Sequence, residues 1–169
     1  MSVEAINAKK VVVEEITGKF NDSQSAVVVE YRGLSVAEVT ELRKALREED
    51  VEFKVYKNKL VQRATESAGY AEINDKLVGP NAIAFGHSDA VAPARVLANF
   101  AKTADALELK CGVVEGTYYD ATGIAAIANI PSRDELLAKF LGSIQSPITN
   151  FARVIKQIAE KDGEAPAEA

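Results

Sequence analysis

Apolar and polar residues alternate from Val51 to Tyr56, and the alternation then gives way to a helical spacing. Val51, Phe53 and Val55 are the apolar members, which is the pattern of a strand with one buried face. Asn58 follows, and we expect it to be the N-cap of a helix because its side-chain oxygen can accept hydrogen bonds from first-turn amides. The apolar residues beyond it recur at the period of a helix: Leu60, Val61, Ala64 and Ala68.

Helical and strand patterns alternate through the first 130 residues. Ser35 and Glu38 have the spacing of a capping box, and Asp120 is placed to cap a short helix. The alternation predicts an α/β domain: a mixed sheet of about four to five strands flanked by helices, with the strand over 25–31 near its centre. Helices are predicted over 5–20, 35–46, 58–68, 93–104 and 120–127, a helical connector over 70–77, and strands over 25–31, 51–55, 81–85, 107–115 and 118–119.

Beyond residue 130 the apolar positions change to a heptad pattern. Ser132 and Glu135 form a second capping box, and a helix over 132–161 would be about 45 Å long. A domain of 130 residues is only about 35 Å across, so this arm cannot bury its whole apolar stripe on its own domain. The stripe has steps of four and three residues, and its members are Leu137, Leu141, Ile144, Ile148, Phe151, Ile155 and Ile158.

Pro147 interrupts this seam. A proline inside a helix removes one amide and clashes with the preceding turn, so we expect a kinked arm that divides into two helical segments. Leaving seven large apolar side chains in water forgoes on the order of 10 kcal/mol, so a partner or self-association must cover them. Residues 162–169 are acidic and polar and are predicted to be a disordered tail.

The net charge of −5 and the pI near 5.1 exclude a protein that coats nucleic acid with its whole surface. A local basic site is still present, because no acidic residue occurs from Phe53 to Thr65. Two of its lysines bracket the predicted helix start, where free amides and the helix dipole favour an anion. The alternative is a solvated charged face, at roughly even odds for the segment alone. The basic site comprises Lys54, Lys57, Asn58, Lys59 and Arg63.

Other cations could extend this site. Arg32 and Gly33 end the strand over 25–31 at a turn where the backbone can approach a ligand closely. Arg43 and Arg47 lie on one face of a helix that also carries glutamates, which is equally typical of a solvated face. Lys9 and Lys10 lie on the outer side of the first helix, where solubility alone would explain them.

Catalytic and metal chemistry is not indicated. His87 is the only histidine, and although Ser88 and Asp89 follow it, triad members must meet from separate elements. Cys111 is the only cysteine, which excludes an internal disulfide and a cysteine-built zinc site. No cofactor motif is present, and no apolar run approaches the roughly 18–20 residues of a membrane span. We therefore expect a cytoplasmic protein that is not an enzyme and binds no cofactor, metal or membrane.

Three motifs occur in an order that resembles a known family. Arg32-Gly33-Leu34 precedes a helix, Lys57-Asn58-Lys59-Leu60 opens the basic helix, and Val78-Gly79-Pro80-Asn81 precedes a strand. Together with the long C-terminal helix, their order and spacing resemble the bacterial large-subunit ribosomal protein ten family, the base of the ribosomal stalk. The resemblance extends over essentially the whole chain.

The resemblance implies a structural role in the large ribosomal subunit. In this family the N-terminal domain binds ribosomal RNA, its first helix included, next to protein eleven. The C-terminal helix carries dimers of the acidic stalk protein (the seven/twelve protein), which recruit translational GTPases. The implied domains are an RNA-binding domain over 1–130, an arm over 131–161 and the tail over 162–169. Because Pro147 divides the seam, we expect two dimers. The alternative is a coiled-coil adaptor without an RNA partner, for which the seam alone suffices.

Overall fold

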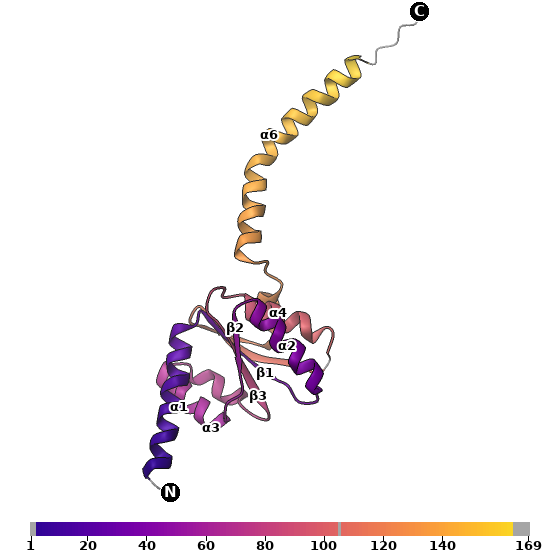
Figure 1. Cartoon of the computed structure of the whole chain (residues 1–169). Coiled ribbons are helices and arrows are strands. Elements are labelled where there is room, and N and C mark those ends of the chain that lie inside the picture. The colour runs from indigo at the N-terminus through magenta and orange to yellow at the C-terminus, as the bar shows by residue number, and fades with distance from the viewer. Residues whose placement is uncertain (1–2, 105, 164–169) are drawn as a thin grey trace, which may run out of the picture. The chain divides into compact units, whose positions relative to one another are not determined.

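The chain forms two compact units, Met1–Pro131 and Ser132–Ala169. The structure is a computed structural model that describes residues 3–104 and 106–163. The first unit holds a sheet and its covering helices, and the second is a single long helix (Figure 1). Each unit is described by itself below.

The first unit is built on a five-stranded sheet with the order β2-β3-β1-β4-β5. All four pairings are antiparallel, where a mixed sheet was expected. The reason is that β3 lies between β2 and β1, and β4 lies between β1 and β5, so strands that point the same way are never neighbours. The strands are β1 (Ser25–Glu30), β2 (Val51–Lys54), β3 (Asn81–Gly86), β4 (Glu108–Val114) and β5 (Thr117–Asp120).

Helices cover both faces of this sheet, which confirms the predicted α/β class (Figure 1). One face packs against α1 (Val3–Asp22), α3 (Asn58–Ala68) and the short 3₁₀ helix η1 (Ala71–Lys76). The other packs against α2 (Val36–Glu48), α4 (Ala92–Ala101) and α5 (Ala121–Ala128). The elements follow the predicted order, and their ends differ from the predicted ones by a few residues.

The two central strands, β1 and β3, are buried on both sides. In β1, Val27 and Val29 face the α2 side, whereas Ala26 and Val28 face the α1 side. All four side chains are at most 2% exposed, which confirms that this strand is central. A continuous apolar run rather than an alternating one is what burial on both faces requires.

Two predicted caps are confirmed. The Glu38 amide donates to the Ser35 hydroxyl at 3.3 Å, and the Ser35 amide donates to the Glu38 carboxylate at 2.6 Å. This is the reciprocal capping box of α2. At α5, the Asp120 carboxylate accepts a hydrogen bond from the Gly123 amide at 2.8 Å. Both caps begin helices of the same sheet face.

The second unit is the helix α6 (Arg133–Gly163), which continues through Pro147. Its ribbon bends part-way along its length, as predicted for a kinked arm (Figure 1). The expected separation into two helical segments is wrong, because a proline removes only its own amide and the helix resumes beyond it. Residues 162 and 163 of the predicted tail belong to this helix, and residues 164–169 lie outside the described residues.

The start of α6 has one half of its predicted capping box. The Ser132 hydroxyl accepts from the Glu135 amide at 3.3 Å. The Glu135 carboxylate pairs instead with Lys139, one turn along the helix, at 2.9 Å. Of the helices in the described part of the chain, none is long and apolar enough to cross a membrane.

Gly112 is required by the packing of the sheet, and its replacement tests the two-faced burial. A Cβ at Gly112 in β4 would lie 2.8 Å from the Ala26 carbonyl oxygen and 2.9 Å from the Ile124 Cδ1. Gly112→Ala should lower the free energy of unfolding by about 1–3 kcal/mol, as overpacking does. Gly18→Ala in α1 is the matched control, because its Cβ would meet nothing within 4 Å. It should raise stability by about 0.5–1 kcal/mol. Urea unfolding of the full chain measures both, and equal stabilities would contradict the tight packing.

Candidate nucleic-acid interface and partner-binding arm

The start of α3 is the centre of the predicted basic site. Lys57, not Asn58, is the N-cap, and it makes no side-chain hydrogen bond to the helix. Asn58 is the first helical residue, and its side-chain nitrogen donates to the Gly79 carbonyl at 2.9 Å. The predicted capping role of Asn58 is therefore wrong, because its side chain is used to tie the helix to a neighbouring turn. The first-turn amides of α3 are left without a side-chain cap.

A shallow hollow of about 400 Å³ lies at this helix start. Residues from three separated stretches of the chain meet there, at strand ends and in the connections beside them. Its lining residues are Tyr31, Val55, Tyr56, Lys57, Asn58, Lys59, Gly79, Pro80 and Asn81.

The charge of the helix start is not neutralised by the protein. Lys57, Lys59 and Arg63 are exposed, and within the described residues none of them forms an ion pair. The first turn of α3 holds no acidic residue, although a helix start favours one. Uncapped amides with adjacent lysines are a favourable environment for a phosphate group.

The turn opposite the helix start is held firmly. Lys110 donates to the Val78 carbonyl at 2.5 Å and to the Asn81 side-chain oxygen at 3.1 Å, and it forms an ion pair with Glu30. Gly79 has a φ of +84°, a conformation that glycine adopts without strain. Since Asn58 binds the Gly79 carbonyl, two carbonyl groups of this turn are fixed by side chains. The wall of the hollow is thus preorganised.

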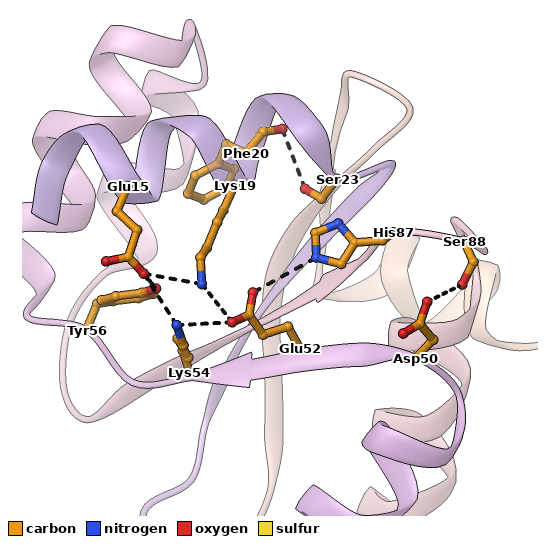
Figure 2. Close-up of polar contacts among 10 residues, drawn as sticks. All are labelled: Glu15, Lys19, Phe20, Ser23, Asp50, Glu52, Lys54, Tyr56, His87 and Ser88. Carbon is orange, nitrogen blue, oxygen red and sulfur yellow. Dashed lines mark hydrogen bonds and ion pairs between the residues drawn. The ribbon is translucent and has the colours of Figure 1, made fainter.

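Lys54 is used differently from the other cations (Figure 2). Its ammonium lies 3.3 Å from Glu15 and 3.1 Å from Glu52, and Lys19 lies 3.3 Å and 2.7 Å from the same two carboxylates. Figure 2 shows Glu15 and Lys19 reaching from α1 towards Lys54 on β2. This network joins helix to sheet, so the positive charge of Lys54 is already paired.

The network also fixes Tyr56, which lines the hollow. The Tyr56 hydroxyl donates to Glu15 at 3.2 Å. Burial raises the pKa of Tyr56 to about 12, so the hydroxyl remains a protonated donor at neutral pH. The far end of the Tyr56 ring is thus held by Glu15, and Glu15 is itself paired with Lys19 and Lys54 (Figure 2).

Arg43 and Arg47 belong to a second hollow, of about 450 Å³, on the α2 side of β2. Lys54 and His87 line it too, together with the acidic Asp50 and Glu52. These carboxylates oppose the binding of an anion there. Of the predicted RNA-binding residues, Lys57, Asn58 and Lys59 line the hollow at α3, whereas Arg43, Arg47 and Lys54 line the second hollow. Of these two hollows, only the one at α3 has no acidic residue in its lining.

The remaining predicted residues line neither of these two hollows. Arg32 is exposed and directly follows Tyr31, which lines the hollow at α3. Gly33 has a φ of +96°, which explains the glycine at this turn. Lys9 and Lys10 are exposed on α1, the helix that packs against α3.

The Ser, His and Asp that suggest a hydrolase contact different partners, and Figure 2 shows this for Ser88 and His87. The Ser88 hydroxyl donates to Asp50 at 3.1 Å, and the His87 ring lies 3.9 Å from Glu52. Asp89 accepts a hydrogen bond from the Val91 amide at 3.0 Å. The contacts of these side chains are those of a loop and not of a nucleophile, base and orienting acid.

The seam of α6 is exposed along its whole described length. Its seven members range from 51% exposed at Ile155 to 74% at Ile148. Phe140, at 62%, widens the same stripe. A contiguous apolar face of this size on a long helix marks an interaction surface.

Comparison with known proteins follows the same division of the chain. Residues 4–102 match the family model for ribosomal protein L10, and residues 130–169 match the model for the ribosomal protein uL10 C-terminal region. The chain belongs to the ribosomal protein L10 family. The Large ribosomal subunit protein uL10 of Bacillus licheniformis is 54% identical over 163 residues, covering 96% of this chain and 98% of the relative. That of Clostridioides difficile is 54% identical over 158 residues, covering 93% and 94%.

Membership of the L10 family settles the general role. The chain is a structural protein of the large ribosomal subunit, takes part in translation on cytoplasmic ribosomes, and is not an enzyme. Among the described residues, no group of three or more His, Cys, Asp or Glu side chains could hold a metal ion.

Sequence reasoning missed three polar side chains of the hollow: Tyr31, Tyr56 and Asn81. Asn81 was part of a motif used for the resemblance, and that motif was the available signal. The two tyrosines follow strand residues, and nothing in their spacing showed that they would meet.

The ion-pair network should make stability depend on pH. Burial raises the pKa of Glu52, but hydrogen bonds from Lys19 and Lys54 outweigh it, so the pKa lies below the usual 4.5. A lowered folded-state pKa stabilises the protein above about pH 4.5, and this stability is lost as the pH falls through the folded value.

Urea unfolding between pH 7 and pH 3 should therefore show a smaller loss of stability for Glu52→Gln than for the unaltered chain. Glu14→Gln is the control, since Glu14 is exposed on the same helix as Glu15. If Glu52→Gln and Glu14→Gln lost stability equally on acidification, the network would not be stabilising.

Proposed function

We propose that the unit Met1–Pro131 binds large-subunit ribosomal RNA through the start of α3, and that α6 carries dimers of the acidic stalk protein. The observation that carries the RNA half is the uncapped start of α3 with Lys57, Lys59 and Arg63 left unpaired among the described residues. Family membership supplies the ribosomal setting in which an RNA phosphate is the available anion.

The RNA surface is centred on the first hollow. Arg32 and Gly33 border it, and Lys9 and Lys10 extend it along α1. Arg43 and Arg47 contribute less, because acidic residues share their hollow. Lys54 acts mainly by joining α1 to β2, since its charge is already paired with Glu15 and Glu52.

The arm is suited to helical partners. Its seam repeats at alternating steps of four and three residues, which is the spacing with which one helix packs along another. The bend in α6 and Pro147 divide the seam near its middle, which supports two docking platforms and two stalk dimers. Each dimer would cover one half of the exposed stripe.

The two halves together tether translation factors to the ribosome. Several flexible factor-binding domains on one arm raise the effective concentration of translational GTPases without one tight site. Ribosomal protein eleven would bind the RNA next to the first unit. The second candidate, a coiled-coil adaptor without an RNA partner, is favoured by the exposed seam and by the net charge of −5.

RNA binding should depend strongly on salt. With four to six phosphate contacts, a plot of log affinity against log salt should have a slope of roughly −3 to −5. Lys57→Glu combined with Lys59→Glu should weaken binding sharply and make the slope shallower by about 1.5, as expected for two lost contacts. Filter binding to large-subunit ribosomal RNA measures both quantities.

The matched control is Lys44→Glu combined with Lys102→Glu, two exposed lysines on the other side of the sheet with the same change in charge. It should keep the original slope. Equal effects of the two double variants would place the RNA site elsewhere, and no binding by the unaltered chain would favour the adaptor.

The arm should hold four copies of the stalk protein. Native mass spectrometry of the co-expressed complex should show two dimers, and Leu141→Asp or Ile155→Asp, on either side of Pro147, should each remove one dimer. Ser143→Asp and Asn150→Asp are the controls, because these exposed residues lie off the seam. Six copies in the unaltered complex would mean a third platform and would contradict the two-dimer assignment.

A further inference from the structure

We propose that the hollow at the start of α3 binds a single unpaired nucleotide of the RNA, with its base inside the hollow and its phosphate at the α3 amides. The inference rests on the proposed RNA-binding function and names the part of the RNA that this site recognises. It is carried by Asn81, which lines the hollow, is 4% exposed, and has a buried amide nitrogen without a hydrogen-bond partner in the described structure.

Lys110 determines which end of the Asn81 amide is left for a ligand. An ammonium group can only donate, so the atom 3.1 Å from the Lys110 nitrogen is the amide oxygen. Lys110 does not line the hollow, whereas Asn81 does. The amide nitrogen is therefore the end of Asn81 that no group in the described structure engages, and a buried donor without a partner is unfavourable until a ligand supplies an acceptor.

The hollow also offers flat apolar surface. The rings of Tyr31 and Tyr56 and the ring of Pro80 contribute to its lining. Tyr56 is fixed through its hydroxyl by Glu15, which two lysines hold in turn (Figure 2). Held aromatic rings beside a basic groove are the surfaces on which unpaired bases stack.

A nucleotide matches this combination of groups. Its base supplies a flat face for the rings and acceptors for the Asn81 amide, and its phosphate suits Lys57, Lys59 and the α3 amides. An acidic peptide could supply acceptors to the lysines and to the Asn81 amide, but its acidic side chains offer no flat face to the rings. The lining therefore favours RNA as the occupant.

The contact made by Asn81 is restricted to donation. An asparagine that recognises adenine uses its oxygen and its nitrogen together, but here the oxygen is occupied by Lys110. The free nitrogen can pair with an acceptor such as a guanine or uracil carbonyl oxygen. The site should thus prefer a base that presents a carbonyl at this edge.

The experiment uses the full chain and the ribosomal RNA fragment that it protects in footprinting. Copies of the fragment carry an abasic residue at one unpaired position at a time, and affinities are measured for the unaltered chain and for Asn81→Asp. The aspartate keeps an oxygen for Lys110, removes the donor and adds one negative charge. At one position the abasic residue should lower the affinity of the unaltered chain roughly tenfold, and it should have little further effect on Asn81→Asp.

The control Asn99→Asp adds the same charge at an exposed position of α4, on the other side of the sheet, and should keep the full sensitivity. A second measurement does not depend on the variant folding: the side-chain amide signal of Asn81 in ¹H–¹⁵N spectra should shift when the RNA fragment binds. If no abasic position couples to Asn81, or if the amide signal does not move, the base site is overturned while RNA binding stands. If the unaltered chain binds no RNA, both proposals fall.

Discussion

The burial of β1 and β3 on both faces constrains everything else in the first unit. A strand covered by helices on both sides cannot carry an exposed polar group on either face, so recognition must occur at strand ends and in connections. The hollow at α3 follows this rule: Asn81 is the first residue of β3, Tyr31 directly follows β1, and Lys57 lies between β2 and α3. The apolar core thereby determines where the cations can gather.

The same unit uses its lysines in two ways. Lys19 and Lys54 join α1 to β2 through ion pairs with two carboxylates, so they stabilise the fold. Lys57 and Lys59 are left at a helix start that favours an anion. Removing the first pair should cost stability, whereas removing the second relieves an unfavourable arrangement. This separation would let an acidic protein keep a local site for a polyanion, as the proposed function requires.

Much of the fold could be read from the sequence because its signals are local. The Ser35–Glu38 capping box, the Asp120 cap and the apolar run of β1 each depend on residues a few positions apart. The antiparallel strand order could not be predicted in this way, because it depends on which strands meet across long connections.

The candidate site was predictable only in part, for the same reason. The segment from Phe53 to Thr65 has no acidic residue, yet Glu15 reaches Lys54 from 39 positions away. Asn58 suits an N-cap locally, but a carbonyl of the distant Gly79 competes for its side chain. The burial of Asn81 likewise depends on Lys110 and on the neighbouring strand. Each of these wrong or missing predictions involves a contact between residues far apart in the sequence, which a short stretch of sequence does not contain.

The exposed seam of α6 has a consequence for the life of the chain before assembly. A helix with seven large apolar side chains open to water attracts other apolar surfaces, including copies of itself and chaperones. Molecules made in excess of their helical partners would be removed by aggregation or proteolysis, whereas covered ones persist. Under the proposed function, the arm would couple the abundance of this protein to the supply of the partner that covers it.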